Sequence, residues 1–171
     1  MRVGADALIA IRTLQPDDRE PILRLLHDTG VFTDEEVAVA LELLDIYLER
    51  TDQQDYDIRT AVDERNNVAG YYCIGPAPMT TGTFDLYWIA VAPAQHQRGV
   101  GKQLLHHAEE NARARGGRLL IAETSSKPSY TRTREFYIRN QYIEVARIKE
   151  YYRTDDDLVI YGKYLSPSGR S

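Results

Sequence analysis

Seven segments of the chain carry the short apolar runs or the alternation that is typical of β-strands. In the stretch 56–63 apolar and polar residues alternate, which predicts a half-buried strand, and 68–75 returns as its hairpin partner after a tight turn at Asn66-Asn67. The segment 83–92 (TFDLYWIAVA) is almost unbroken apolar sequence, which predicts a central strand. The other predicted strands are 7–13, 118–124, 142–149 and 157–165.

Four further segments have apolar residues at helical spacing. Thr33 and Glu36 form a capping box, which predicts the start of a helix that carries Val37, Ala40 and Leu44 on one face. A helix from about Gly99 places Leu104, Leu105, Ala108 and Ala112 on its apolar face, and it ends at Gly116-Gly117. We expect Glu109 and Arg113 to pair on the solvent side of that helix. The remaining helices are predicted from Pro16 or Asp17, and over 130–140.

The order of these elements is strand, two helices, three strands, helix, strand, helix, two strands. The strand–helix–strand unit from 83 to 124 implies two parallel neighbours joined by a right-handed crossover, whereas the flanking hairpins are antiparallel. The sequence therefore predicts an α/β fold, with about seven strands in a mixed, twisted sheet and about four flanking helices. We expect one domain over 1–171, with a core at about 8–165 and a loose tail at 166–171.

Composition narrows the class of protein. Apolar residues make up 43% and charged residues 27% of the chain, as in globular domains, and no apolar run approaches the length of about 20 residues that crosses a bilayer. The N-terminus lacks the pattern of a signal peptide, and the single cysteine, Cys73, suits a reducing compartment, so we expect a cytoplasmic location without membrane partners. The net charge of −5 argues against a nucleic-acid surface.

Two glycines, Gly99 and Gly101, lie directly at the start of the helix that follows the central strand. The first turn of a helix exposes free N–H groups and a partial positive charge, and Arg98 and Lys102 add two cations there, so this turn is a candidate anion site. Its spacing matches neither GxxxxGK[ST] nor GxGxxG. The alternative is a glycine-containing loop with solvated charges. The position of the turn, at the carboxyl end of a central strand, favours a ligand site.

The stretch IAVAPAQHQRGVGKQLL resembles the acyl-coenzyme A motif of the GNAT acetyltransferase superfamily, (Gln/Arg)-x-x-Gly-x-(Gly/Ala). Gly99, Val100 and Gly101 fit that motif, and His96 stands at its first position. A second family signature, Asn-x-x-Ala-x-x-Phe-Tyr-x-x-x-Gly-Phe, is similar to 130–142. Phe136 and Tyr137 match it, whereas Tyr130, Thr133, Gln141 and Tyr142 replace the family's Asn, Ala, Gly and Phe. The resemblance covers about 8–165.

The resemblance implies a GNAT-like fold with a V-shaped splay between strands 83–92 and 118–124, which receives acetyl-CoA as co-substrate. Its pantetheine arm would pair with the backbone of Ile89, Ala90 and Val91. Its pyrophosphate would lie on the amides of Gln97, Arg98, Gly99, Val100, Gly101 and Lys102, and His96, Tyr130 and Thr133 complete the expected cofactor contacts. No metal is expected, and we interpret His106 and His107 as surface residues, because adjacent side chains on a helix point about 100° apart.

The implied activity is transfer of acetyl from a thioester to a primary amine of a small molecule or peptide. By analogy with the family, the N–H near Val91 stabilises the oxyanion and Tyr137 is the general acid; the alternative for Tyr137 is a core aromatic. Asp85 and Glu123 are the candidate general bases, because an acidic residue in a central strand must face a cleft, a water or a partner. Either could instead form a salt bridge, and a water relay or an already neutral amine would need neither.

The acceptor pocket of this fold implies Phe32, Tyr87, Tyr151 and Tyr152 as candidate lining residues. The run Asp155-Asp156-Asp157 in the last hairpin could attract a cationic amine, although we favour a solvated turn. Two other functions stay open at this point: a non-catalytic acyl-CoA sensor or partner-binding module, and a structural protein with a vestigial cleft. Edge strands near the C-terminus could pair between subunits of a homodimer.

Overall fold

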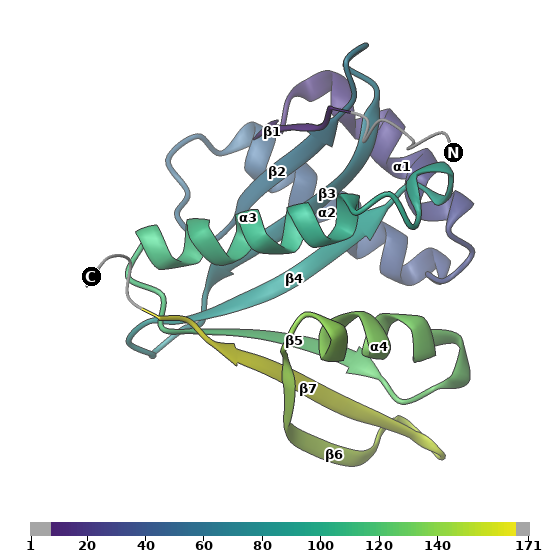
Figure 1. Ribbon diagram of the computed structural model, residues 1–171, viewed down its shortest axis with the longest axis vertical. Coiled ribbons are helices and arrows are strands. Elements are labelled where there is room, and N and C mark those ends of the chain that lie inside the picture. Colours follow the sequence, from purple (N-terminus) through teal and green to yellow (C-terminus); the bar gives the residue numbers. More distant parts are fainter. Residues whose placement is uncertain (1–7, 167–171) are drawn as a thin grey trace, which may run out of the picture. The chain divides into compact units, whose positions relative to one another are not determined.

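The computed structural model describes residues 8–166 and shows the predicted order of seven strands and four α-helices (Figure 1). The strands are β1 (Ala10–Thr13), β2 (Asp57–Val62), β3 (Val68–Pro76), β4 (Thr83–Val91), β5 (Leu119–Ser125), β6 (Ile143–Arg153) and β7 (Asp156–Tyr164). The α-helices are α1 (Arg19–Asp28), α2 (Asp34–Glu49), α3 (Val100–Ala114) and α4 (Thr131–Arg139), with 3₁₀ turns η1 (Pro16–Asp18), η2 (Pro93–Gln95) and η3 (Pro128–Tyr130). Ala7 of the first predicted strand and the predicted tail from residue 167 lie outside the described residues.

The strands form one sheet in the order β1-β2-β3-β4-β5-β7-β6. The β4–β5 pair is parallel, as the strand–helix–strand pattern predicted, and the pairs β1–β2, β5–β7 and β6–β7 are antiparallel. The parallel ladder joins three residue pairs, from Thr83↔Leu119 to Asp85↔Ile121. The expected divergence of β4 and β5 beyond these pairs stays a prediction.

The described chain divides into two compact units. The first contains the described residues up to Cys73 together with Trp88–His107, and the second contains Ile74–Tyr87 and the described residues from Ala108 onward. Strands β3 and β4 and helix α3 each contribute residues to both units. The expectation of a single domain stays a prediction.

Helices α1 and α2 bury their apolar faces in the core of the first unit. The capping box at the start of α2 is present: the Glu36 amide donates to the Thr33 hydroxyl (3.2 Å), and the Thr33 amide donates to the Glu36 carboxylate (2.8 Å). The core cluster combines one face of each helix with residues of β2, β3 and β4. Its buried members are Leu14, Ile22, Leu25, Leu26, Val37, Ala40, Leu44, Ile58, Tyr71, Cys73 and Ala90.

The last hairpin of the chain corrects the prediction of a solvated turn at Asp155-Asp156-Asp157. The turn itself is Thr154-Asp155, and Asp156 is the first residue of β7 with an exposed fraction of 2%. The Asp156 carboxylate accepts a hydrogen bond from the Ser125 hydroxyl and pairs with the Lys127 ammonium at 3.3 Å. A buried carboxylate requires such partners, and here they come from the end of β5, which the local sequence of the hairpin could not indicate.

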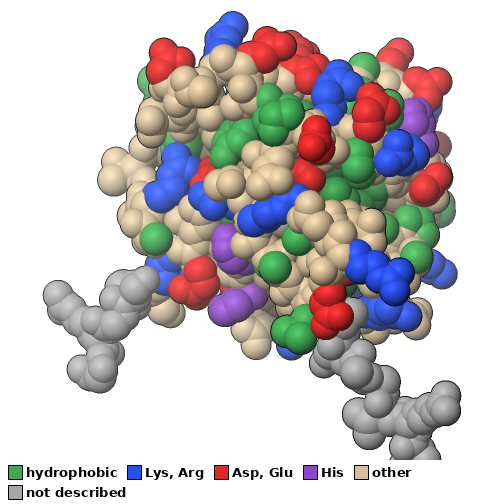
Figure 2. Space-filling model, turned by 90° about the horizontal axis from the view of Figure 1, so that it is seen from above, with side chains coloured by type: hydrophobic (Ala, Val, Ile, Leu, Met, Phe, Trp, Pro, Cys, Tyr) green, Lys and Arg blue, Asp and Glu red, His purple; other side chains and the backbone are tan. Residues whose placement is uncertain are grey.

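On the face shown in Figure 2, basic and acidic side chains are interspersed rather than gathered into one patch of a single sign. Within residues 8–166, no helix combines the length and the apolar character that a membrane span requires.

An ion pair between β1 and the start of α1 fixes the entry into the first helix. The Arg12 guanidinium donates to both Asp18 carboxylate oxygens, at 2.6 Å and 2.9 Å, and also to the Asn66 side-chain oxygen in the β2–β3 turn at 3.1 Å. Asp18 is 4% exposed, and its carboxylate also accepts from the Gln15 amide at 2.9 Å. Burial alone opposes ionisation, but these hydrogen bonds outweigh it, and the pKa of Asp18 lies below its usual value.

We predict that Asp18→Ala lowers the free energy of unfolding by about 2 kcal/mol at pH 7, because it leaves Arg12 without its partner. A carboxyl with a lowered folded-state pKa stabilises the fold above its unfolded pKa of about 3.9, and this contribution is lost as the pH falls through the folded value. The difference between wild type and variant in urea unfolding should therefore shrink below about pH 4. Asp17→Ala, on the exposed neighbour, is the control and should change stability by no more than about 0.5 kcal/mol. Equal effects of the two substitutions would contradict the prediction.

Candidate functional site: the turn before α3 and the Tyr137 cluster

The link from β4 to α3 is short and contains two residues in the left-handed region. Strand β4 ends at Val91, η2 makes one 3₁₀ turn, and Gln97 and Gly99 have φ angles of 63° and 76° before α3 begins at Val100. A Cβ atom placed on Gly99 would meet no other atom within 4 Å. Glycine therefore favours the left-handed backbone conformation at this position, and the space beside it is open to a bulky group.

The amides at this turn are unpaired donors. In the part of the chain that the structure describes, the backbone N–H groups of Gln97, Gly99, Val100, Gly101 and Lys102 have no hydrogen-bond acceptor, and the first bond of α3 runs from the Gln103 amide to the Gly99 carbonyl at 3.0 Å. The Arg98 amide reaches the Gln95 carbonyl only at 3.4 Å. The exposed side chains of Arg98 and Lys102 form no ion pair with a described residue. Free donors and two cations thus meet at the positive end of a helix.

His96 and strand β3 hold the turn in place. The His96 Nε2 atom lies 3.0 Å from the Val91 carbonyl oxygen, to which it donates, so the imidazole closes the turn onto the end of β4. The Ala92 amide donates to the Ala69 carbonyl at 2.9 Å. A Cβ atom on Gly70 would come within 2.7 Å of the Ala90 carbonyl oxygen, so the absence of a side chain there permits the close approach of β3 and β4. Of the predicted backbone contacts, Ala90 is buried, whereas Ile89 and Val91 are partly exposed.

Tyr137 of α4 lies in a cluster of aromatic rings in the second unit. Its ring stacks on Tyr161 of β7 with centroids 5.6 Å apart, and it contacts Tyr142 at 5.5 Å and Phe136 at 5.6 Å. The side chain is 4% exposed, and no described residue hydrogen-bonds to its hydroxyl. Burial raises the pKa of Tyr137, so the phenol keeps its proton at neutral pH. Tyr130 is the N-cap residue of α4, and Thr133 lies half-buried in its first turn.

An ion pair between the buried Glu109 and the partly buried Lys163 supports this cluster and corrects the prediction for Glu109. Glu109 does not pair with Arg113 at the surface: it is 5% exposed, and the Lys163 ammonium lies 3.0 Å and 3.1 Å from its two carboxylate oxygens. Arg113 pairs with Glu110 instead. The Tyr142 hydroxyl donates to Glu109 at 3.2 Å, and the Lys163 ammonium lies 5.6 Å from the Tyr142 ring centroid. Since Tyr142 also contacts Tyr137, the ion pair fixes one neighbour of the candidate acid.

The two candidate bases, Asp85 and Glu123, share one face of the sheet. Asp85 is opposite Ile121 in the parallel ladder, and Glu123 follows two residues later on the same side of β5. Ala122 lies between Ile121 and Glu123 on β5, so its side chain points to the other face. It is opposite Tyr161, on which Tyr137 stacks. The carboxylates and the phenol therefore lie on opposite faces of the second unit's sheet. Asp85 and Ile121 are partly exposed and Glu123 is exposed, so the carboxylate face is open.

Both carboxylates have pKa values above their usual values. Burial raises the pKa of Asp85, against a smaller opposite effect of a hydrogen bond from Tyr87. Partial desolvation by the surrounding protein also raises the pKa of Glu123, and the nearby Asp85 carboxylate adds to the rise. Neither pairs with a described Lys or Arg, so the salt-bridge alternative is wrong for the described residues. A raised pKa makes each a stronger base than a carboxylate in water.

The loop between β5 and α4 is anchored by residues that the sequence did not single out. The Arg134 guanidinium donates to the carbonyls of Ser125 and Lys127 at 2.7 Å and 2.8 Å, and the Lys127 amide donates to the Ser125 hydroxyl at 3.1 Å. Together with the bond between Ser125 and Asp156, these contacts fix the start of α4 and hence the position of Tyr137 along it.

The four residues predicted to line an acceptor pocket lie in different segments of the chain, and their role stays a prediction. Tyr151 and Tyr152 pack edge to face on the exposed strand β6, and Tyr87 is 37% exposed beside Asp85. In the first unit, Phe32 packs on Trp88 with ring centroids 5.3 Å apart.

His106 is exposed, but His107 is not the surface residue that we expected. Its Nδ1 lies 2.8 Å from the hydroxyl of the fully buried Tyr72. Burial, followed by the charge of Arg59, lowers the pKa of His107.

Comparison with known proteins agrees with this geometry. The sequence profile of the Acetyltransferase (GNAT) family matches residues 20–141. The chain belongs to the GNAT acetyltransferase family. A crystal structure of a protein assigned to this family, from Desulfovibrio desulfuricans, is 41% identical, with a TM-score of 0.89 over 93% of this chain and 100% of the other. No protein with curated annotation matches the chain.

Two more distant structures share the fold. The ribosomal-protein-S18-alanine N-acetyltransferase of Escherichia coli is 18% identical, with a TM-score of 0.72 over 96% of this chain and 98% of that chain. An aminoglycoside 6'-N-acetyltransferase complexed with coenzyme A is 16% identical, with a TM-score of 0.72 over 94% of this chain and 99% of that chain. The α/β fold and the acetyltransferase family predicted from the sequence are thereby confirmed.

We predict that Lys163→Met lowers the free energy of unfolding by about 3 kcal/mol, because the Glu109 carboxylate then stays buried without its cation. Adding Glu109→Gln to Lys163→Met should recover part of that loss, which a double-mutant cycle in chemical denaturation measures. Lys149→Met, on the exposed strand β6, is the matched control and should stay within about 0.5 kcal/mol of wild type. Strict additivity of the two core substitutions would show that the pair contributes nothing.

Proposed function

We propose that the protein is an acetyl-CoA-dependent N-acetyltransferase that acetylates a primary amine of a small molecule or peptide by direct transfer. The observation that carries this proposal is the set of unpaired amides of Gln97 and of residues 99–102, in the turn that joins β4 to α3, in a chain of the GNAT family. Free N–H groups with Arg98 and Lys102 beside them fit a diphosphate. The open space at Gly99 lets such a group approach the backbone closely.

The bound thioester supplies an activated acyl carbon, and this chain supplies donors, acceptors and position. As the carbon–nitrogen bond forms and the carbon–sulfur bond breaks, the sulfur leaves as a thiolate and takes up a proton. A protonated amine loses two protons: the first before it attacks, and the second as the amide forms, which returns through solvent to the group that protonated the thiolate. We assign the proton for the thiolate to the Tyr137 hydroxyl, which is protonated at neutral pH and has no hydrogen-bond partner among the described residues. The backbone N–H of Val91 is proposed as the donor to the oxygen that gains negative charge.

The first proton of the amine, which it loses before it attacks, goes to a carboxylate in this proposal. Asp85 and Glu123 lie on an open face of the sheet, have raised pKa values and lack a cationic partner among the described residues. A cationic amine would be attracted by the two negative charges before it loses its proton. Since Glu123 is the more exposed of the two and lies further along β5, we assign the base to Glu123 and the electrostatic attraction to Asp85.

We predict that Tyr137→Phe lowers kcat by roughly 10²-fold with any acceptor that the enzyme acetylates, while KM for acetyl-CoA changes less than about twofold. Release of free thiol from acetyl-CoA in the presence of a panel of primary amines measures both constants. The melting temperature should stay close to that of wild type, because the hydroxyl makes no hydrogen bond to the described residues.

Tyr164→Phe is the control for this experiment, because it removes a phenol from an exposed position on β7. Unchanged kcat in Tyr137→Phe would refute the role of the acid. Tight binding of coenzyme A without thiol release for any amine would favour the non-catalytic sensor instead.

We predict that Arg98→Ala with Lys102→Ala raises KM for acetyl-CoA about tenfold, because two cations are lost at the proposed diphosphate site. In the same thiol-release assay, the fold-decrease in kcat should be smaller than the fold-increase in KM. Arg50→Ala, which removes an exposed cation after α2, should leave both constants unchanged. A KM equal to that of wild type in the double variant would place the diphosphate elsewhere.

A further inference from the structure

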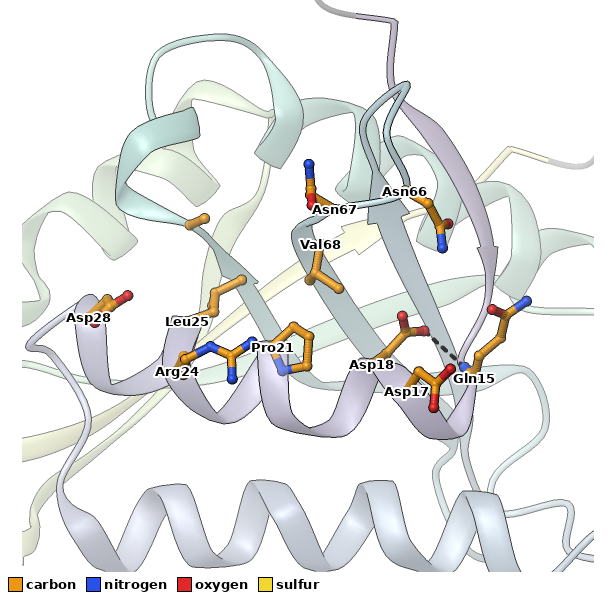
Figure 3. A pocket seen from close by; sticks show the side chains of 11 residues that line it. Gln15, Asp17, Asp18, Pro21, Arg24, Leu25, Asp28, Asn66, Asn67 and Val68 are labelled. Atoms are coloured by element: carbon orange, nitrogen blue, oxygen red, sulfur yellow. Dashed lines mark hydrogen bonds between the residues drawn. The ribbon is translucent and has the colours of Figure 1, made fainter.

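A groove with a volume of about 360 Å³ lies in the first unit between α1, the β2–β3 turn and the end of β4 (Figure 3). The residues of its lining that matter for recognition are Asp17, Pro21, Arg24, Leu25, Asp28 and Val68. Pro21, Arg24, Leu25 and Asp28 recur at helical spacing along α1, so one face of the helix forms one wall of the groove. The lining includes none of the residues 95–102 that form the proposed diphosphate site.

The walls of the groove are fixed before any ligand binds. Arg12 links Asp18, at the start of α1, to the Asn66 side chain in the β2–β3 turn. The next residue of that turn, Asn67, donates through its amide and its side chain to Asp63 at 2.8 Å and 3.0 Å. Fixed walls reduce the conformational entropy that a ligand must remove on binding.

Three charged side chains at the groove have no partner. Asp17, Arg24 and Asp28 are exposed, and none forms an ion pair or hydrogen bond with another described residue. Arg24 and Asp28 have opposite charges at i and i+4 on one helix, a spacing at which such residues commonly pair, yet they do not pair with each other. Their donors and acceptors are therefore free for a ligand.

The pair of Arg24 and Asp28 suits a ligand that carries both charges close together. A helix rises about 1.5 Å per residue, so their backbones are about 6 Å apart along α1, within the combined reach of the two side chains. An α-amino acid presents a carboxylate to a guanidinium and an ammonium to a carboxylate over such a distance. A phosphate fits less well, because Asp28 would repel it.

The remainder of the groove suits a long side chain that ends in a cation. Leu25 of α1 and Val68 of β3 point toward each other across the groove, and Pro21 lies one turn before Leu25 (Figure 3). Beyond this apolar part lies Asp17, about 10 Å from Arg24 along the helix axis. The three free charges sum to −1, which a ligand with a net charge of +1 neutralises.

We propose that this groove binds an α-amino acid with a basic side chain, of the lysine and arginine class. Its carboxylate pairs with Arg24, its α-ammonium with Asp28 and its distal cation with Asp17, while its methylene groups cover Pro21 and Val68. The site is separate from the proposed acetyl-transfer residues, so it does not depend on that function.

Titration calorimetry of the full chain with L-lysine tests this proposal. L-norleucine, which lacks the distal cation, and 1,5-diaminopentane, which lacks the carboxylate, should each bind at least about tenfold more weakly. Asp28→Asn and Arg24→Gln should each weaken L-lysine binding about tenfold, and Asp17→Asn should weaken L-lysine binding but leave L-norleucine binding unchanged. Glu20→Gln, on the same helix but outside the lining, should have no effect.

The Asp85→Asn variant separates this groove from an acceptor site, because Asp85 is the group proposed to attract the acceptor amine, whereas L-lysine should bind to the groove of this variant with the affinity of wild type. Absence of heat with L-lysine at concentrations on the order of 10 mM would overturn the proposal. So would equal affinities for L-lysine and 1,5-diaminopentane, or L-lysine binding that Asp85→Asn abolishes and the three groove substitutions leave intact.

Discussion

The link between β4 and α3 is the constraint on which the candidate site depends. Residues 92–99 must turn the chain from a strand into a helix, and none of them supplies a side-chain cap to the first helical amides. Two residues in the left-handed region and the bond from His96 to the Val91 carbonyl hold the turn without using those amides. A helix that begins in this way keeps its positive end unneutralised, which is the electrostatic condition for an anion site.

The second unit shows how buried polar groups fix an aromatic cluster. The Glu109 carboxylate is buried, and it is tolerated there because the partly buried Lys163 ammonium compensates its charge. Tyr142, which stands where the family motif has Phe, uses its extra hydroxyl to bond Glu109. Gln141, which stands where the motif has Gly, has φ of 69°, and a side chain in that region costs about 1 kcal/mol or more. Both departures from the motif thus have a visible structural consequence.

The sequence predicted the order and type of the elements because hydrophobic periodicity is local information. The cap at Thr33 and the start of α3 near Gly99 depend on neighbouring residues, and both were predicted correctly. The β2–β3 hairpin was also predicted, but its turn is at Glu64-Arg65, two residues before the predicted Asn66-Asn67. The other errors concern polar residues whose partners are distant: Glu109 bonds Lys163 at a separation of 54 residues, Ser125 bonds Asp156 at 31, and Tyr72 bonds His107 at 35. Periodicity indicates which face a residue occupies, but it does not indicate which side chain from another element will meet it.

In the proposed mechanism, the sheet of the second unit separates the proton donor, Tyr137, from the proton acceptor, Glu123. Tyr137 packs on the face that carries Ala122 and Tyr161, where burial keeps a phenol protonated, whereas Glu123 lies on the open face, where solvent tolerates a charged carboxylate. Because residues alternate between the faces of a strand, two adjacent positions of β5 suffice to create these two environments. A group that gives a proton and a group that takes one can therefore be tuned independently, without a shared hydrogen bond that would couple their pKa values.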